Sequence, residues 1–215
     1  MNAITTIFYT ISNALLVPTE LALILSLLAA CYAVGVALRE TFARRAEASS
    51  RAALETGLTE DAAFDVAKFL AERDAKLGRA MTVVKEIAEK ADDEPFVEKK
   101  ISEFESDVKR RCERTERLVK IGPALGLMGT LIPLGPALLG LAQGDLNTLA
   151  ANLVVAFSTT VVGLTTAIIA SFVLAAQKRW ARADFIFVNF AVNRCAEQLG
   201  KSKESKGRVH GNIAE

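Results

Sequence analysis

The residues of this chain that could assist ion movement are threonines set in long uncharged stretches. Thr130 follows a glycine-rich run, and Thr159 and Thr160 lie within a later apolar stretch. A hydroxyl group lowers the cost of water or an ion passing near it. Both stretches lack an ionisable side chain, which a proton or sodium relay within a membrane normally requires. If the chain conducts ions, a partner must therefore supply the carboxylate.

Helix packing alone is the competing explanation for these threonines. A threonine hydroxyl can bond the carbonyl one turn back and never meet an ion. Gly122, Gly126 and Gly129 have three- and four-residue spacing, which lets another helix backbone approach closely. Small and hydroxyl-bearing residues also share one face of the later stretch: Asn152, Ala156, Thr159, Gly163, Thr166 and Ala170. The pattern predicts close packing whether or not ions pass.

The charges of the chain are segregated in a way that is typical of membrane proteins. All 26 Lys and Arg residues fall within residues 39–120 and 178–215, and only Glu20 and Asp145 among the acids lie outside these blocks. Because basic residues near short loops stay in the cytoplasm, both blocks are predicted to be cytoplasmic. No positive charge precedes Arg39, which argues against a cleaved signal peptide. We expect a multi-pass protein of the cytoplasmic membrane, with its N-terminus outside and its C-terminus in the cytoplasm.

The hydropathy pattern predicts an all-α integral membrane protein with three transmembrane helices and long cytoplasmic helical extensions. A kink is expected at Pro18, a break at Gly57 and a turn around residues 92–95. Periodic apolar residues after Val97 predict one helix that continues into the second span. The expected segments are an exterior interfacial helix (1–17), transmembrane helix 1 (18–38), a cytoplasmic helical domain (39–120), transmembrane helix 2 (121–142), an exterior turn (143–148), transmembrane helix 3 (149–177), a cytoplasmic helix (178–199) and a disordered tail (200–215).

The sequence carries no motif of ordinary enzymology. It has no phosphate loop, no histidine cluster, no paired acids within a span and no nucleophile elbow. Cys31, Cys112 and Cys195 are far apart without metal-ligand spacing, so we expect reduced thiols. The lone His210 is interpreted as incidental. We therefore expect no enzyme activity, cofactor, metal or nucleic acid.

Two motifs in register resemble the second and third spans of the MotA/TolQ/ExbB proton channel family. They are Gly122-Pro-Ala-Leu-Gly-Leu-Met-Gly-Thr130 and Thr160-Val-Val-Gly-Leu-Thr-Thr-Ala-Ile168. The order of one span, a large insert, two closely spaced spans and a tail is also similar. Val155 stands where the family commonly has an acidic residue, and residues 132–134 depart from its usual pattern. The resemblance is to a divergent member.

This resemblance implies a pore-forming subunit of a proton- or sodium-driven membrane motor. Five copies would form a ring, lined by the second and third spans, around a single-span partner of the ExbD/TolR/MotB type that carries an ion-binding aspartate. It implies that Thr130 and Thr160 line the pore, with Thr159 and Gly163 beside them. Two alternatives stay open: a non-conducting oligomeric membrane scaffold, and an accessory subunit of a transporter.

Overall fold

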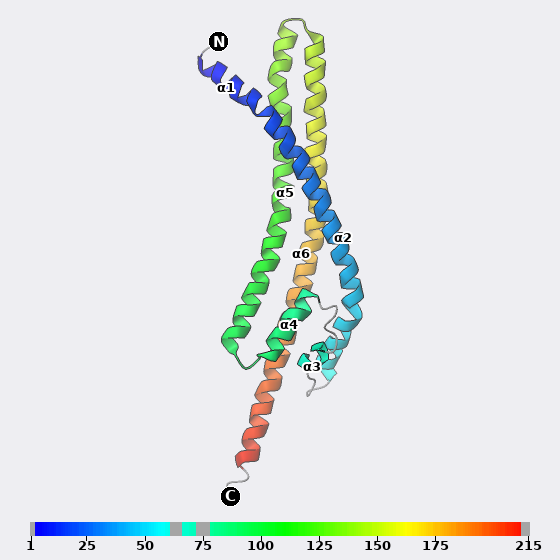
Figure 1. The fold of residues 1–215 in the computed structure, drawn as a ribbon, viewed down its shortest axis with the longest axis vertical. Helices are drawn as coiled ribbons and strands as arrows, with labels where there is room; N and C mark the ends of the chain where they lie inside the picture. The colour runs from blue at the N-terminus through cyan, green and yellow to red at the C-terminus, as the bar shows by residue number, and fades with distance from the viewer. Residues whose placement is uncertain (1–2, 61–65, 72–77, 212–215) are drawn as a thin grey trace. The chain divides into compact units, whose positions relative to one another are not determined.

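The computed structural model describes residues 3–60, 66–71 and 78–211 (Figure 1). Within these ranges the elements are all α helices: α1 (Ala3–Ala14), α2 (Leu16–Glu60), α3 (Val66–Ala71), α4 (Arg79–Glu89), α5 (Glu94–Ala142) and α6 (Leu146–Gly211). Three helical segments, which contain most of α2, α5 and α6, are long and apolar enough to cross a membrane. The expected all-α class and the three membrane-spanning helices are confirmed.

The break between α1 and α2 lies at Leu15, not at Pro18. The first four amide groups of a helix have no partner within that helix, so a proline in the first turn costs no hydrogen bond. Pro18 occupies that position in α2. The hydroxyl of Thr19 donates to the Leu15 carbonyl at 2.7 Å and closes the same turn. The expected kink at Pro18 was therefore wrong by three residues.

Helix α2 runs through Gly57 and ends at Glu60, so the expected break at Gly57 was also wrong. A glycine within a helix costs about 1 kcal/mol relative to alanine. Leu54 and Leu58, on either side of Gly57, are 0% and 2% exposed. Burying two leucine side chains stabilises by about 1.5–3 kcal/mol each, which outweighs the glycine.

Helices α5 and α6 each continue beyond the expected span. Helix α5 begins at Glu94, within the turn expected around residues 92–95, and includes Pro123, Pro133 and Pro136 without ending. This confirms that the helix that follows Val97 continues into the second apolar stretch. Helix α6 is continuous to Gly211. The predicted disorder after residue 200, and His210, fall where side chains are not described, so they stay predictions.

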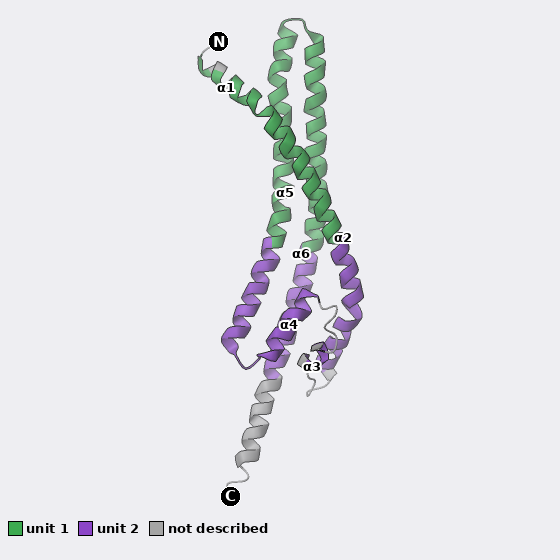
Figure 2. Cartoon of the chain, viewed as in Figure 1, with its two compact units in different colours: residues 1–37, 111–177 green, residues 38–110, 178–215 purple. Residues whose placement is uncertain are grey.

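The chain divides into two compact units (Figure 2). Unit 1 comprises residues 1–37 and 111–177, and it holds the apolar parts of α2, α5 and α6. Its interior is built from small or short side chains, such as Ala30, Ala137, Ala170 and Thr166, each 0% exposed. Many of its large apolar side chains face outward, and Phe157 is 68% exposed. So much exposed apolar surface requires lipid or other protein around it.

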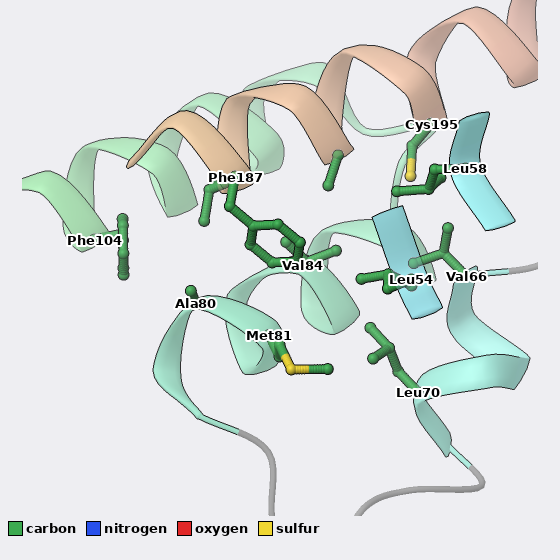
Figure 3. Packing of buried hydrophobic residues seen from close by; sticks show 12 residues of the cluster. Leu54, Leu58, Val66, Leu70, Ala80, Met81, Val84, Phe104, Phe187 and Cys195 are labelled. Carbon is green, nitrogen blue, oxygen red and sulfur yellow. The ribbon is translucent and has the colours of Figure 1, made fainter. Parts of the chain in front are cut away.

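Unit 2 comprises residues 38–110 and 178–215, and it has an ordinary hydrophobic core (Figure 3). Five helices contribute buried residues to one cluster: Leu54 and Leu58 of α2, Val66 and Leu70 of α3, Ala80, Met81 and Val84 of α4, Phe104 of α5, and Phe187, Val188, Ala191 and Cys195 of α6. The short helices α3 and α4 complete this core. Unit 2 therefore packs as a soluble domain does.

Candidate functional site

The apolar parts of α5 and α6 pack backbone against backbone at glycines. A Cβ atom added to Gly122 would lie 2.8 Å from the Gly163 carbonyl oxygen, and one added to Gly163 would lie 2.8 Å from the Gly126 Cα. Real Cβ atoms essentially never come closer than 3.0 Å to such atoms. The glycine spacing in α5 thus serves a direct contact with α6 inside unit 1, as the small-residue pattern predicts.

Thr159 continues this contact one turn further along. A Cβ atom on Gly129 would lie 2.6 Å from both Cβ and Oγ1 of Thr159. Thr159 is 9% exposed, and its hydroxyl donates to the carbonyl oxygens of Val155 at 3.1 Å and Ala156 at 2.9 Å. Thr159 and Gly163 therefore lie inside the helix pair of a single chain.

Thr130 and Thr160 lie at the edge of the same contact and are half-buried. The Cα of Thr160 would be 3.5 Å from a Cβ atom on Gly126, and Thr130 directly follows Gly129. The hydroxyl of Thr130 donates to the Leu127 carbonyl at 2.7 Å, and that of Thr160 donates to the Ala156 carbonyl at 3.1 Å. A hydroxyl oxygen has two acceptor lone pairs, so each can still accept a hydrogen bond or face a cation.

The four residues expected to line a pore thus fall into two pairs. Thr130 and Thr160 keep part of their surface accessible in the single chain, whereas Thr159 and Gly163 are enclosed by α5. Whether any of them meets an ion stays a prediction. Gly122, Gly126 and Gly129, expected to pack helices, are all buried.

Two further hydroxyl residues of α6 were not singled out from the sequence. Ser158 and Thr165 are exposed and seven residues apart, which places them on one helix face. The Ser158 hydroxyl donates to the Val154 carbonyl at 2.7 Å. Their seven-residue spacing could have indicated this face from the sequence. The longer stripe of small residues on the neighbouring face gave a stronger signal, so Ser158 and Thr165 were missed.

The turn between α5 and α6 is closed by Asp145. Gly144 adopts φ +76°, a backbone region that favours glycine. The Asp145 carboxylate accepts hydrogen bonds from the Thr148 hydroxyl at 2.5 Å and from the amides of Asn147 and Thr148 at 3.1 Å. These bonds, first of all that of the Thr148 hydroxyl, lower the pKa of Asp145. The side chain caps the first turn of α6.

Comparison with known families adds the decisive observation. The model of the MotA/TolQ/ExbB proton channel family matches residues 66–184, more than half of the chain. The chain belongs to this family. No curated protein and no solved structure gives a significant match.

The family match covers α3, α4, α5 and α6 as far as Asp184, and therefore all seven predicted site residues. Membership in the MotA/TolQ/ExbB family, together with three membrane-spanning helices, identifies a membrane protein with a channel role related to ion-driven motors. Proteins of this family form ion-channel complexes with partners.

Proposed function

We propose that this chain is the pore-forming subunit of a membrane motor in which a proton or sodium current moves a single-span partner. Copies of the chain, five by analogy with the family, would close into a ring through their exposed apolar surfaces. The partner would stand inside the ring and carry the carboxylate that takes up the ion. Unit 2, with its basic blocks, would lie in the cytoplasm, and the α5–α6 turn would lie on the opposite side.

The observation that carries this proposal is the α5–α6 helix pair within the family-matched segment. Its glycine contact brings Thr130 and Thr160 to the edge of one helix pair. Their hydroxyl donors are used within their own helices, so their free lone pairs suit a cation or a protonated carboxyl group. No ionisable side chain occurs in residues 121–142 or 149–177, which is why the proposal requires a partner carboxylate.

The exposed apolar surface of unit 1 supports assembly. Leu131 of α5 and Val161 of α6 are 59% and 63% exposed. In a membrane, lipid and other copies of the chain would cover these exposed side chains. Because small residues form the contact within each helix pair, large residues remain outside it for contacts with lipid and with other copies.

Native mass spectrometry of the detergent-extracted complex tests the assembly. The chain would be purified through a tag after Gly200, beyond the described core of unit 2. Five copies of the chain with two copies of a smaller single-span protein are the expected result. A monomer or dimer without such a protein would contradict the motor, and the scaffold or transporter-accessory alternatives would then lead.

A further inference from the structure

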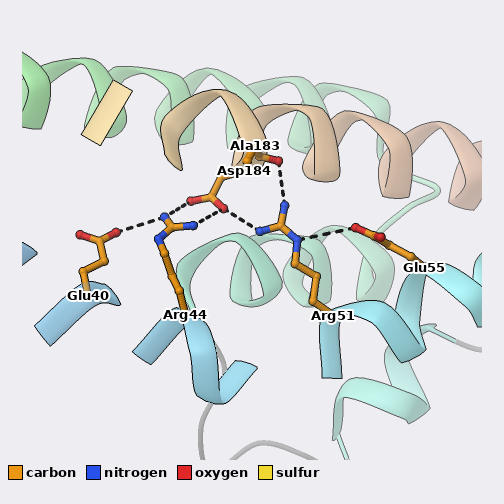
Figure 4. A network of polar contacts seen from close by, with 6 residues as sticks. All are labelled: Glu40, Arg44, Arg51, Glu55, Ala183 and Asp184. Atoms are coloured by element: carbon orange, nitrogen blue, oxygen red, sulfur yellow. Dashed lines mark hydrogen bonds and ion pairs between the residues drawn. The ribbon is translucent and has the colours of Figure 1, made fainter. Parts of the chain in front are cut away.

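A single carboxylate in unit 2 accepts hydrogen bonds from two arginines of another helix (Figure 4). Asp184 of α6 is 8% exposed and accepts hydrogen bonds from Arg44 and Arg51 of α2. Nη1 of Arg44 lies 2.9 Å from Oδ1 of Asp184, and its Nη2 bonds the second oxygen. Nη1 of Arg51 also lies 2.9 Å from Oδ1, while its Nη2 donates to the Ala183 carbonyl at 2.7 Å.

Aromatic rings on α6 hold both guanidinium groups in place. The Cζ of Arg44 lies 5.3 Å from the centroid of the Trp180 ring, and that of Arg51 lies 4.2 Å from the centroid of the Phe187 ring. Trp180 and Phe187 lie four residues before and three after Asp184, on the same helix face. Arg44 and Arg51 are seven residues apart, so they also share one face of α2. The two helix faces are therefore complementary in spacing and in charge.

Two further acids of α2, Glu40 and Glu55, also contact these arginines. Glu40 accepts from Nη2 of Arg44 at 3.1 Å, and Glu55 lies 3.7 Å from Nε of Arg51. Burial opposes the charge on Arg44, but its bonds with Asp184 and Glu40 outweigh this, so the pKa of Arg44 is raised. The Glu47 carboxylate lies between these arginines in sequence and reaches Gly78 at the start of α4. Burial raises the pKa of Glu47.

From this geometry we propose that Asp184, held by Arg44 and Arg51, ties α2 to α6 so that these helices move as one body during the ion-driven cycle. Asp184 is a positioning residue and does not touch the ion. Multiple bonds to one buried carboxylate, with aromatic rings against both cations, favour a permanent tie over a contact that opens. The family match ends at Asp184 and excludes both arginines, so the tie couples α2 to the matched segment. This inference rests on the channel function proposed above.

The first test compares two substitutions in α6. Asp184→Asn keeps the size of the side chain and removes its charge. Glu197→Gln is the matched control, because Glu197 forms an exposed pair with Arg194 at 2.9 Å within the same helix. Ion flux into liposomes, normalised to assembled complex by native mass spectrometry, should fall about tenfold for Asp184→Asn, a change that corresponds to about 1.4 kcal/mol in the barrier. It should be unchanged for Glu197→Gln. Wild-type flux in Asp184→Asn would overturn the tie.

The second test keeps the tie intact and joins the same helices covalently. Glu55 of α2 and Ala183 of α6 are both exposed, and both contact Arg51. In a chain without Cys31 and Cys112, Glu55→Cys and Ala183→Cys would be joined with a short thiol cross-linker, while the buried Cys195 stays unlabelled. If α2 and α6 move as one body, the joined complex conducts as the unjoined complex does. A block of flux that a cleavable cross-linker releases on reduction would show that the helices slide, and would overturn the proposal.

Amide hydrogen exchange separates failure of the tie from failure of the channel. If the wild-type complex carries no ion flux, the motor proposal fails. The tie between α2 and α6 can still be tested, because hydrogen exchange does not depend on ion flux. Asp184→Asn should then raise exchange both in residues 40–58 and in residues 180–195, whereas Glu197→Gln should raise it in neither. Unchanged exchange in Asp184→Asn would overturn the tie on its own.

Discussion

Gly163 of α6 and Gly122 of α5 meet through their backbones. A Cβ atom on Gly163 would lie 2.6 Å from the Gly122 carbonyl oxygen, and the three atoms nearest to it would all be backbone atoms of α5. Backbone cannot rotate away as a flexible side chain can. The contact therefore fixes how closely the apolar parts of α5 and α6 approach.

Gly163→Ala should loosen this helix pair. The added methyl group must push α5 away, and overpacking of this kind costs about 1–3 kcal/mol. Gly35→Ala in α2 is the matched control, because nothing lies within 4 Å of its added Cβ atom. Thermal unfolding of the detergent-solubilised protein, followed by circular dichroism, measures both. Equal unfolding temperatures for the two variants would contradict the backbone contact.

Leu54→Ala should destabilise unit 2 through loss of core packing. Leu54 is 0% exposed within the cluster of five helices, and substitutions of this type cost about 2–5 kcal/mol. Phe42→Ala in the same helix serves as the control, because Phe42 is 66% exposed. Hydrogen exchange of the amides in residues 79–89 reports on the core. Faster exchange is expected for Leu54→Ala, and a similar increase for Phe42→Ala would argue against this core.

The fold was largely predictable because charge segregation and hydropathy are strong signals in membrane proteins. They placed the apolar parts of α2, α5 and α6 and the turn at Asp145. Two local predictions were wrong because Pro18 and Gly57 were judged by their intrinsic preferences alone. Pro18 lies in the first turn of α2, where a proline is tolerated, and Gly57 lies near the buried Leu54, whose packing keeps the helix intact. Tertiary packing overrides such preferences.

The Asp184 tie was not predicted, although its signal exists in the sequence. Asp184 is an acid within a basic block, and Arg44 and Arg51 are seven residues apart. What the sequence could not supply is the pairing of α2 with α6, because Arg44 and Arg51 are 140 and 133 residues away from Asp184 along the chain. The packing glycines of α5 were easier to predict, since glycines at three- and four-residue spacing indicate a contact face without naming its partner.

The cap at Asp145 should make the α5–α6 turn sensitive to acid. Hydrogen bonds from Thr148 lower the pKa of Asp145 below its ordinary 3.8, so the carboxylate stabilises the folded turn above that value. This contribution is lost as the pH falls through the lower, folded pKa. Asp145→Asn can still accept the amide bonds and should remove the pH dependence below pH 3.8, whereas Asp145→Ala should remove the cap at every pH. Thermal unfolding across this range measures both, and an unchanged acid limb in Asp145→Asn would contradict the assignment.

Cys195 should be an unreactive thiol in the folded protein. Burial raises the pKa of Cys195 above the ordinary 9.0, so the unfolded chain loses this proton at a lower pH than the folded chain. Stability should therefore fall as the pH rises above 9.0, because the unfolded state then binds fewer protons. Maleimide labelling followed by peptide mass spectrometry should find Cys195 protected until denaturant is added. Cys195→Ala removes the titrating group and should flatten the decline.

Thr130→Val and Thr160→Val separate a conducting ring from a scaffold. Each change replaces a hydroxyl with a methyl group of similar size, so packing is conserved while the acceptor oxygen is lost. A hydrogen bond to a charged group contributes about 1.5–3 kcal/mol, and losing it at the barrier corresponds to about tenfold or more in rate. Thr166→Val is the matched control, because Thr166 is 0% exposed and its hydroxyl donates to the Val162 carbonyl of its own helix at 2.9 Å. Ion flux per assembled complex should fall for the first two variants and not for the third. If all three conduct alike, the hydroxyls only pack helices, and the ion must pass elsewhere or not at all.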